Sequence, residues 1–121
     1  MCQKILILDD DTNLLETLTI LLDDNGYEVK SLSSGEKALQ TIHEFNPDLV
    51  LMDVMLGDMD GVLICRDIKK QPGMLSLPVI LISGHFDLEK LLDQPGAPND
   101  FLAKPFDIDV LLGKIKNQLA A

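Results

Sequence analysis

The chain has 121 residues, 46% of them hydrophobic, and a formal net charge of −10 from 20 acidic and 10 basic side chains. This length suits one domain, and such acidity argues against direct binding of nucleic acid, whose phosphates would be repelled. No apolar run approaches a membrane span, the N-terminus lacks a signal-peptide pattern, and two cysteines are too few for a disulfide framework or a zinc site. We therefore expect one cytoplasmic domain over residues 1–121 that does not bind membranes.

Five short apolar runs predict strands. In chain order they are residues 4–8, 27–32, 48–53, 78–82 and 100–103. Most of these runs are continuously apolar, which is typical of strands buried on both faces of a parallel sheet covered by helices. The run at 27–32 alternates only weakly between apolar and polar residues, so we expect it at an edge of the sheet.

Amphipathic helical patterns separate these strands and follow the last one. Caps are expected at Asp11 for the first helix, at Ser33 with Glu36 as a capping box for the second, and at Asp107 for the last. The helices lie before Asn25-Gly26, before Asn46-Pro47, at 61–70, at 87–93, and from Asp107 onward. A strand–helix unit repeated five times predicts an α/β fold, a doubly wound parallel sheet with helices on both faces.

Polar residues stand at the carboxyl ends of these strands, where open α/β sheets bind their ligands. The first strand presents Asp9 and Asp10, the third Asp53, the fourth Ser83 and the fifth Lys104. Three acids in one cleft repel one another, and proteins seldom leave such a cluster without a cation. The donors are all oxygens, which indicates a hard ion, and Mg²⁺ is the usual one where phosphate is also bound.

The same side chains suit phosphoryl transfer. Lys104 would meet one phosphoryl oxygen, and the Ser83 hydroxyl would donate a hydrogen bond to another. A carboxylate such as that of Asp53 is an established nucleophile toward phosphorus and gives an acyl phosphate. Each residue alone has an ordinary structural explanation, since acids cap helices, serines begin turns and lysines lie at surfaces. Together, at the strand ends of one α/β domain, they favour a phosphoryl site.

The chain resembles the receiver domains of two-component response regulators over essentially its whole length. The motifs that carry the resemblance lie at residues 5–11, 48–56, 59–61, 78–84 and 101–106. The resemblance implies a single receiver domain over residues 1–121 with a flavodoxin-like five-stranded sheet in the order 2-1-3-4-5. It also implies a cis peptide bond between Lys104 and Pro105.

The resemblance implies how the acids act. Asp53 is the phosphoacceptor and takes its phosphoryl group from the phosphohistidine of a sensor histidine kinase or a phosphotransfer protein. The metal, Mg²⁺ with Mn²⁺ as a substitute, is bound directly by Asp10, Asp53 and the Met55 carbonyl, and through water by Asp9. The protein would catalyse its own phosphorylation and dephosphorylation and would not be a turnover enzyme.

The resemblance also implies a switch. Ser83 and Lys104 contact the phosphoryl group, and Phe101 changes its rotamer when Ser83 moves. Met55 and His85 hold positions that influence how fast the acyl phosphate hydrolyses, although His85 is also well explained as a plain turn residue. The changed surface would then meet a downstream effector protein or an output domain beyond this chain.

The chain departs from the family's usual pattern in two places. Gly57-Asp58 replaces the usual Pro-Gly after the phosphoacceptor, which predicts a more flexible loop with an added negative charge. The stretch from Ser83 to Lys104 contains Pro95 and Pro98 and a brief helical pattern, which puts the usual output face in question.

Rival classes fit these residues less well. A haloacid-dehalogenase-type phosphatase needs a second acid two residues after its nucleophile, where this chain has Met55. A flavodoxin-like electron carrier needs a hydroxyl- and glycine-rich phosphate loop, whereas the acids at 9–11 would repel phosphate. The alternative that stays open is a receiver-shaped interaction module with weak or no phosphorylation. Metal-dependent binding of a fluoride phosphoryl mimic separates this module from a working phosphoryl pocket.

Overall fold

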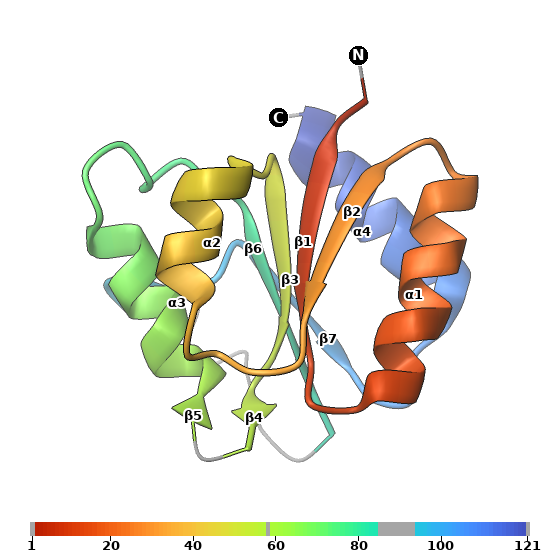
Figure 1. The fold of residues 1–121 in the computed structure, drawn as a ribbon, viewed down its shortest axis with the longest axis horizontal. Helices are drawn as coiled ribbons and strands as arrows, with labels where there is room; N and C mark the ends of the chain where they lie inside the picture. Colours follow the sequence, from red (N-terminus) through yellow and green to blue (C-terminus); the bar gives the residue numbers. More distant parts are fainter. Residues whose placement is uncertain (1, 58, 85–93, 121) are drawn as a thin grey trace.

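A computed structural model describes residues 2–57, 59–84 and 94–120 (Figure 1). Its elements are β1 (Lys4–Leu8), α1 (Thr12–Asp24), β2 (Glu28–Leu32), α2 (Ala38–Phe45), β3 (Leu49–Asp53), β4 (Met55–Leu56), β5 (Met59–Asp60), α3 (Gly61–Lys70), β6 (Val79–Ser83), β7 (Asp100–Ala103) and α4 (Ile108–Ala120). The helix expected at 87–93, together with Asp58 and His85, lies outside the described residues. No helix among the described residues is long and apolar enough to cross a bilayer.

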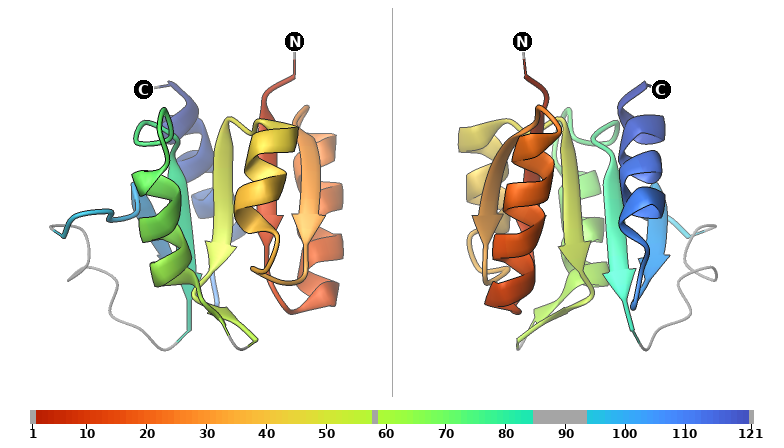
Figure 2. Two further views of the ribbon diagram at one scale, coloured as in Figure 1. Left: turned by 60° about the vertical axis from the view of Figure 1, so that its left-hand side comes forward. Right: turned by 90° about the vertical axis from the view of Figure 1, so that its right-hand side faces the viewer.

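The main sheet has five parallel strands in the order β2-β1-β3-β6-β7. This arrangement confirms the predicted doubly wound fold and the order 2-1-3-4-5, with β2 at one edge as expected. Figure 1 shows α2 and α3 on one face of the sheet and α1 and α4 on the other, an arrangement that the side views in Figure 2 also show.

Alternate residues of each central strand supply two separate cores. Leu6 and Leu8 of β1 belong to the core under α2 and α3, whereas Ile5 and Ile7 belong to the core under α1 and α4. β3 and β6 divide their side chains in the same way. Because both faces need apolar side chains, a buried parallel strand is apolar at every position, which explains the continuous runs in the sequence.

The register of the sheet makes the central strands end at one level. Leu8 lies opposite Met52, Asp53 lies opposite Ile82, and Ser83 lies opposite Ala103. The ladder continues one step further, since the Lys104 N–H donates to the Ser83 carbonyl over 2.9 Å. The polar residues that follow or end these strands therefore meet at the carboxyl end of the sheet.

Two helix ends agree with the sequence predictions, the cap at Asp11 and the end of the second helix before Asn46-Pro47. The Asp11 carboxylate accepts hydrogen bonds from the N–H groups at the start of α1, which confirms its capping role. Asn46 ends α2 with a φ of 55°, in the left-handed region that Asn tolerates.

The capping box from Ser33 to Glu36 is wrong. α2 begins only at Ala38, without a side-chain cap, and the Glu36 N–H donates instead to Ser34 Oγ over 3.2 Å. A turn forms here instead, in which the Ala38 N–H donates to the Gly35 carbonyl over 3.1 Å. α2 begins after this turn, and Gly35 lies close to the Ile64 side chain on α3.

The segment after β3 was predicted as a loop, and the structure instead forms a short antiparallel hairpin from β4 and β5. Met55 pairs with Asp60, and Leu56 pairs with Met59, across a two-residue connection. Gly57, the first residue of that connection, has a φ of 61°, a value that glycine adopts without steric cost and that two-residue hairpin turns commonly need.

A buried lysine, Lys69, connects α3 to the segments at the amino ends of β6 and β7. This end of the sheet is opposite the carboxyl end, where the polar residues gather. Lys69 donates from Nζ to the carbonyls of Leu75 and Leu77, at 3.2 and 2.5 Å, and to Asn99 Oδ1 at 2.6 Å. Asn99 Oδ1 also accepts the N–H that begins β6. Burial lowers the pKa of Lys69, because desolvation penalises its charged form, yet all three ammonium protons have an acceptor.

We expect Lys69→Met to lower the free energy of unfolding by about 2–3 kcal/mol, because it leaves buried acceptors without a donor. Lys70 is exposed on the same helix and gives the matched control, Lys70→Met, whose effect should stay within about 0.5 kcal/mol. Urea unfolding followed by circular dichroism measures both variants. Equally small losses would mean that the Lys69 hydrogen bonds add no net stability.

Candidate phosphoryl and metal site

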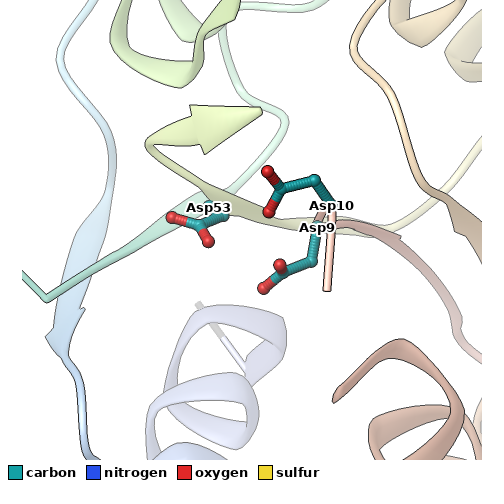
Figure 3. Close-up of side chains that lie close together, drawn as sticks. All are labelled: Asp9, Asp10 and Asp53. Carbon is teal, nitrogen blue, oxygen red and sulfur yellow. The ribbon is translucent and has the colours of Figure 1, made fainter. Parts of the chain in front are cut away.

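Three aspartates meet where β1 and β3 end. One carboxylate oxygen from each of Asp9, Asp10 and Asp53 lies within 4.8 Å of the other two. Figure 3 shows the three side chains close together, with the carboxylates of Asp9 and Asp10 directed toward Asp53. Asp9 and Asp53 are buried, with exposed fractions of 1% and 7%, whereas Asp10 is exposed to solvent.

Local backbone hydrogen bonds fix the two buried carboxylates. Asp9 Oδ1 accepts from the Asp11 N–H over 2.9 Å, and Asp53 Oδ1 accepts from the Met55 N–H over 3.1 Å. Each bond spans two residues, a turn that aspartate forms readily and that follows directly from its place after a strand. Both carboxylates are thus held by the chain that immediately follows them, and each keeps a second oxygen for other partners.

Lys104 supplies positive charge to this cluster from the end of β7. Its Nζ lies 2.8 Å from Asp53 Oδ2 and 3.3 Å from Asp9 Oδ2. Burial raises the pKa of Asp9 and the neighbouring Asp53 charge raises it further, against the N–H of Asp11 and the Lys104 charge. Burial alone would lower the pKa of Lys104, but its hydrogen bond to Asp53 and the charge of Asp9 outweigh burial and raise it.

A pocket of about 820 Å³ opens over the acid cluster. Its charged lining residues are Asp10, Asp11, Asp53 and Lys104, and the rest of its lining comes from α1, the hairpin, Gly84 after β6, and the segment that enters α4. The apolar lining residues include Leu14, Leu18, Met55, Pro105, Phe106 and Ile108. Asp10 and Asp53 are therefore open to a ligand from the pocket, while Asp9 lies buried beside them.

The donor set of the cluster fits a hard divalent cation. All three side chains offer carboxylate oxygens, the ligands that Mg²⁺ and Mn²⁺ prefer, and they converge closely enough to share one ion. Among the described residues, Lys104 is the one cation paired with this cluster and it contacts two of the three carboxylates, so an excess of negative charge is left that a metal ion would offset. The residues present therefore fit Mg²⁺ on charge, ligand type and spacing.

The predicted switch residues lie beside the site on β6 and β7. Ser83 is buried at the end of β6, and Phe101 on β7 is half-buried and packs against the core under α2 and α3. On α4, Lys114 Nζ lies 5.8 Å from the centre of the Phe101 ring and 3.1 Å from Asp100 Oδ1. The ring thus lies between the apolar core and a charged group at the sheet edge.

One residue that shapes the site, Gly61, was given no role in the sequence analysis beyond its place in the motif at 59–61. A Cβ on Gly61 would overlap the Asp53 carbonyl and the Val54 Cα, and the Gly61 N–H donates to the Val54 carbonyl over 2.7 Å. Only glycine permits α3 to begin this close to the end of β3. The available signal was its position, a glycine at the first residue of a predicted helix that directly follows the site loop.

The Lys104-Pro105 bond is cis, as expected.

A family model described as response regulator receiver domain matches residues 5–116. The chain belongs to this family. It is 33% identical over 120 residues to the DNA-binding response regulator MtrA of Mycobacterium leprae, a match that covers 98% of this chain and 52% of that protein. MtrA of Mycobacterium tuberculosis is 33% identical over 98% of this chain and 51% of its own. The receiver domain thus spans about half the length of the curated relatives it matches.

Solved structures give the same assignment. A response regulator from Chloroflexus aurantiacus superposes with a TM-score of 0.90 at 35% identity, covering 100% of both chains. A CheY-like receiver domain protein from Methanospirillum hungatei gives a TM-score of 0.88 at 30% identity, covering 99% of this chain and 95% of that one. The protein is therefore a receiver domain of two-component signalling, a class of signalling domain with this sheet and helix arrangement.

We expect Lys104→Met to lower the free energy of unfolding of the metal-free protein by about 2–4 kcal/mol, because it leaves two buried carboxylates without their cation. Lys114→Met is the matched control. It breaks the more exposed pair with Asp100 and should cost about 1 kcal/mol or less. Chemical denaturation in the presence of a chelator measures both. A loss for Lys104→Met no larger than that of the control would contradict the assigned role of this ion pair.

Proposed function

We propose that Asp53 is the phosphoacceptor of this receiver domain. The observation that carries the proposal is the pairing of Asp53 with Lys104 at 2.8 Å, beside two further acids, at the mouth of an open pocket. An isolated surface acid has neither a fixed cation nor other acids beside it. The resemblance of the surrounding motifs to those of phosphorylated receivers supports the same assignment.

In the proposed reaction an oxygen of Asp53 forms a bond to phosphorus while the bond from phosphorus to the donor's imidazole nitrogen breaks. The Met55 N–H holds the carboxylate in one orientation before the reaction. Lys104 lies within reach of the transferred group, where its charge offsets the charge on a phosphoryl oxygen. The Ser83 hydroxyl donates a hydrogen bond to another such oxygen.

We assign Mg²⁺ to the acid cluster, held by Asp10, Asp53 and the Met55 carbonyl and, through water, by Asp9. A bound divalent cation supplies neutralisation of charge on the phosphoryl oxygens, which Lys104 alone does not complete. The chain's own part is to hold these oxygens together against their mutual repulsion. Lys104 offsets the negative charges of Asp9 and Asp53. The pairing of β1 with β3 holds the backbone in place where these strands end.

We further propose that a sensor histidine kinase or a phosphotransfer protein donates the phosphoryl group. MtrA, the relative named above, is described as DNA-binding, and this chain spans about half of its length. The receiver, with its net charge of −10, would not contact nucleic acid itself. Its output would pass through an effector protein or an output domain, and the protein would act as a switch in the cytoplasm and not as a turnover enzyme.

We expect Asp53→Asn to abolish labelling by a small phosphodonor such as acetyl phosphate, because the amide is not nucleophilic. Asp60→Asn is the matched control, since Asp60 lies in the hairpin that follows Asp53 and caps α3, a role that Asn also fills. Intact-mass spectrometry, with and without Mg²⁺, measures the label. Undiminished phosphate on Asp53→Asn would contradict the assignment of Asp53 as phosphoacceptor. Equal labelling of the wild type with and without Mg²⁺ would contradict the proposed metal site.

We propose that phosphorylation is read out through Ser83 and Phe101. A hydrogen bond from Ser83 to the phosphoryl group would draw the end of β6 toward Asp53, and Phe101, one strand away on β7, would turn into the space left behind. The neighbouring contacts of Lys114 with the ring and with Asp100 would then change. The phosphoryl group shifts the equilibrium between the arrangements before and after Phe101 turns only by the difference in its interaction with the two.

For this switch we expect beryllium fluoride with Mg²⁺, a phosphoryl mimic, to change the backbone NMR shifts of Phe101, Leu111 and Lys114 in the wild type. Ser83→Ala should bind the mimic but change these shifts much less, while Ser83→Thr, which keeps the hydroxyl, should respond as the wild type does. Wild-type shifts confined to the surroundings of Asp53 would mean that this receiver signals through another face. No binding of the mimic at all would favour the interaction-module alternative.

A further inference from the structure

The Asp10 carboxylate is held differently from its two neighbours. Asp10 Oδ2 accepts a hydrogen bond from the Gly57 N–H over 3.3 Å, across 47 positions of the chain. Among the described residues this is the sole hydrogen bond or ion pair to that carboxylate, whereas Asp9 and Asp53 both have Lys104. The least buried acid of the cluster, which is repelled by two others, is therefore oriented by one backbone donor.

The geometry of the hairpin makes this donor available. Gly57 follows β4 with a φ of 61°, and an added Cβ there would meet nothing within 4 Å, so conformation and not space favours glycine. Proline at this position would remove the N–H and fix φ near −65°. The hydrogen bond thus depends on two properties of this chain, a donor at residue 57 and a backbone that turns it toward Asp10.

We propose that Gly57 is a positioning residue for the metal site. This inference rests on the proposed assignment of Mg²⁺ to the acid cluster. The bond from Gly57 is made to Oδ2 and fixes the orientation of the Asp10 carboxylate, one oxygen of which lies within 4.8 Å of oxygens of Asp9 and Asp53. Ordering a ligand before the ion arrives removes part of the entropic cost of binding, as donors to metal-bound carboxylates generally do.

Two replacements test the role of this N–H. Gly57→Pro removes the donor, and a glycolic-acid ester at position 57, introduced by chemical ligation, removes it while leaving the side chain unchanged. Gly57→Asn keeps the N–H and tolerates positive φ, so it is the matched control. The measurements are the Kd for Mg²⁺ by calorimetry, the melting temperature without metal, and the carboxyl ¹³C shifts of Asp10 and Asp53.

We expect the proline and ester variants to bind Mg²⁺ about tenfold more weakly, with Gly57→Asn close to the wild type. The ¹³C shift of Asp10 should change in the ester variant while that of Asp53 stays, because the Met55 N–H still holds Asp53. An ester variant with wild-type or tighter Mg²⁺ affinity would overturn the inference. So would equal shifts at both carboxyls, which would indicate a collapsed hairpin.

The proposed metal site has its own control. Asp10→Ala should weaken Mg²⁺ binding in the wild-type background. If it does not, the ion binds elsewhere, and both the metal assignment and the role of Gly57 are wrong. If Asp10→Ala weakens binding but the ester does not, the metal assignment stands and the inference about Gly57 alone fails.

Discussion

The contact on which the site depends is the ammonium group of Lys104 between Asp9 and Asp53, at 3.3 and 2.8 Å. Two carboxylates this deeply buried are stable as charges only beside a cation, because desolvation penalises each of them. Lys104 reaches both since β7 ends level with β6, and β6 with β3. One ion pair network therefore links three strand ends and fixes the position of the proposed phosphoacceptor.

The same arrangement leaves the cluster incomplete, and this is the basis of its proposed chemistry. One ammonium group balances only part of the charge of three acids, and Asp10 lies on the open side with a backbone N–H as its partner. A divalent cation and a phosphoryl group would add positive and negative charge in the same small volume. The two ligands are thus expected to favour each other's binding, with Lys104 and the hairpin already in place.

Structure away from the site serves to hold these strand ends in register. The two cores, divided by alternate residues of β1, β3 and β6, fix each strand between two layers of helices. At the other end of the sheet, Lys69 joins α3 to the segments that enter β6 and β7. Gly61 lets α3 begin against the end of β3. Each of these contacts limits how far the residues at the site can move.

The amino-acid sequence by itself determined the fold class and the identity of the residues at the strand ends. Continuous apolar runs mean strands buried on both faces, and in a parallel sheet the residues after such runs, among them Asp9, Asp53 and Lys104, must gather at one edge. The tertiary structure decided which of them touch. Lys104 pairs with Asp9 across 95 positions, Gly57 reaches Asp10 across 47, and Gly35 lies close to Ile64 on α3. Local patterns carry no information on such contacts, because they arise from strand register and from the packing of one element on another.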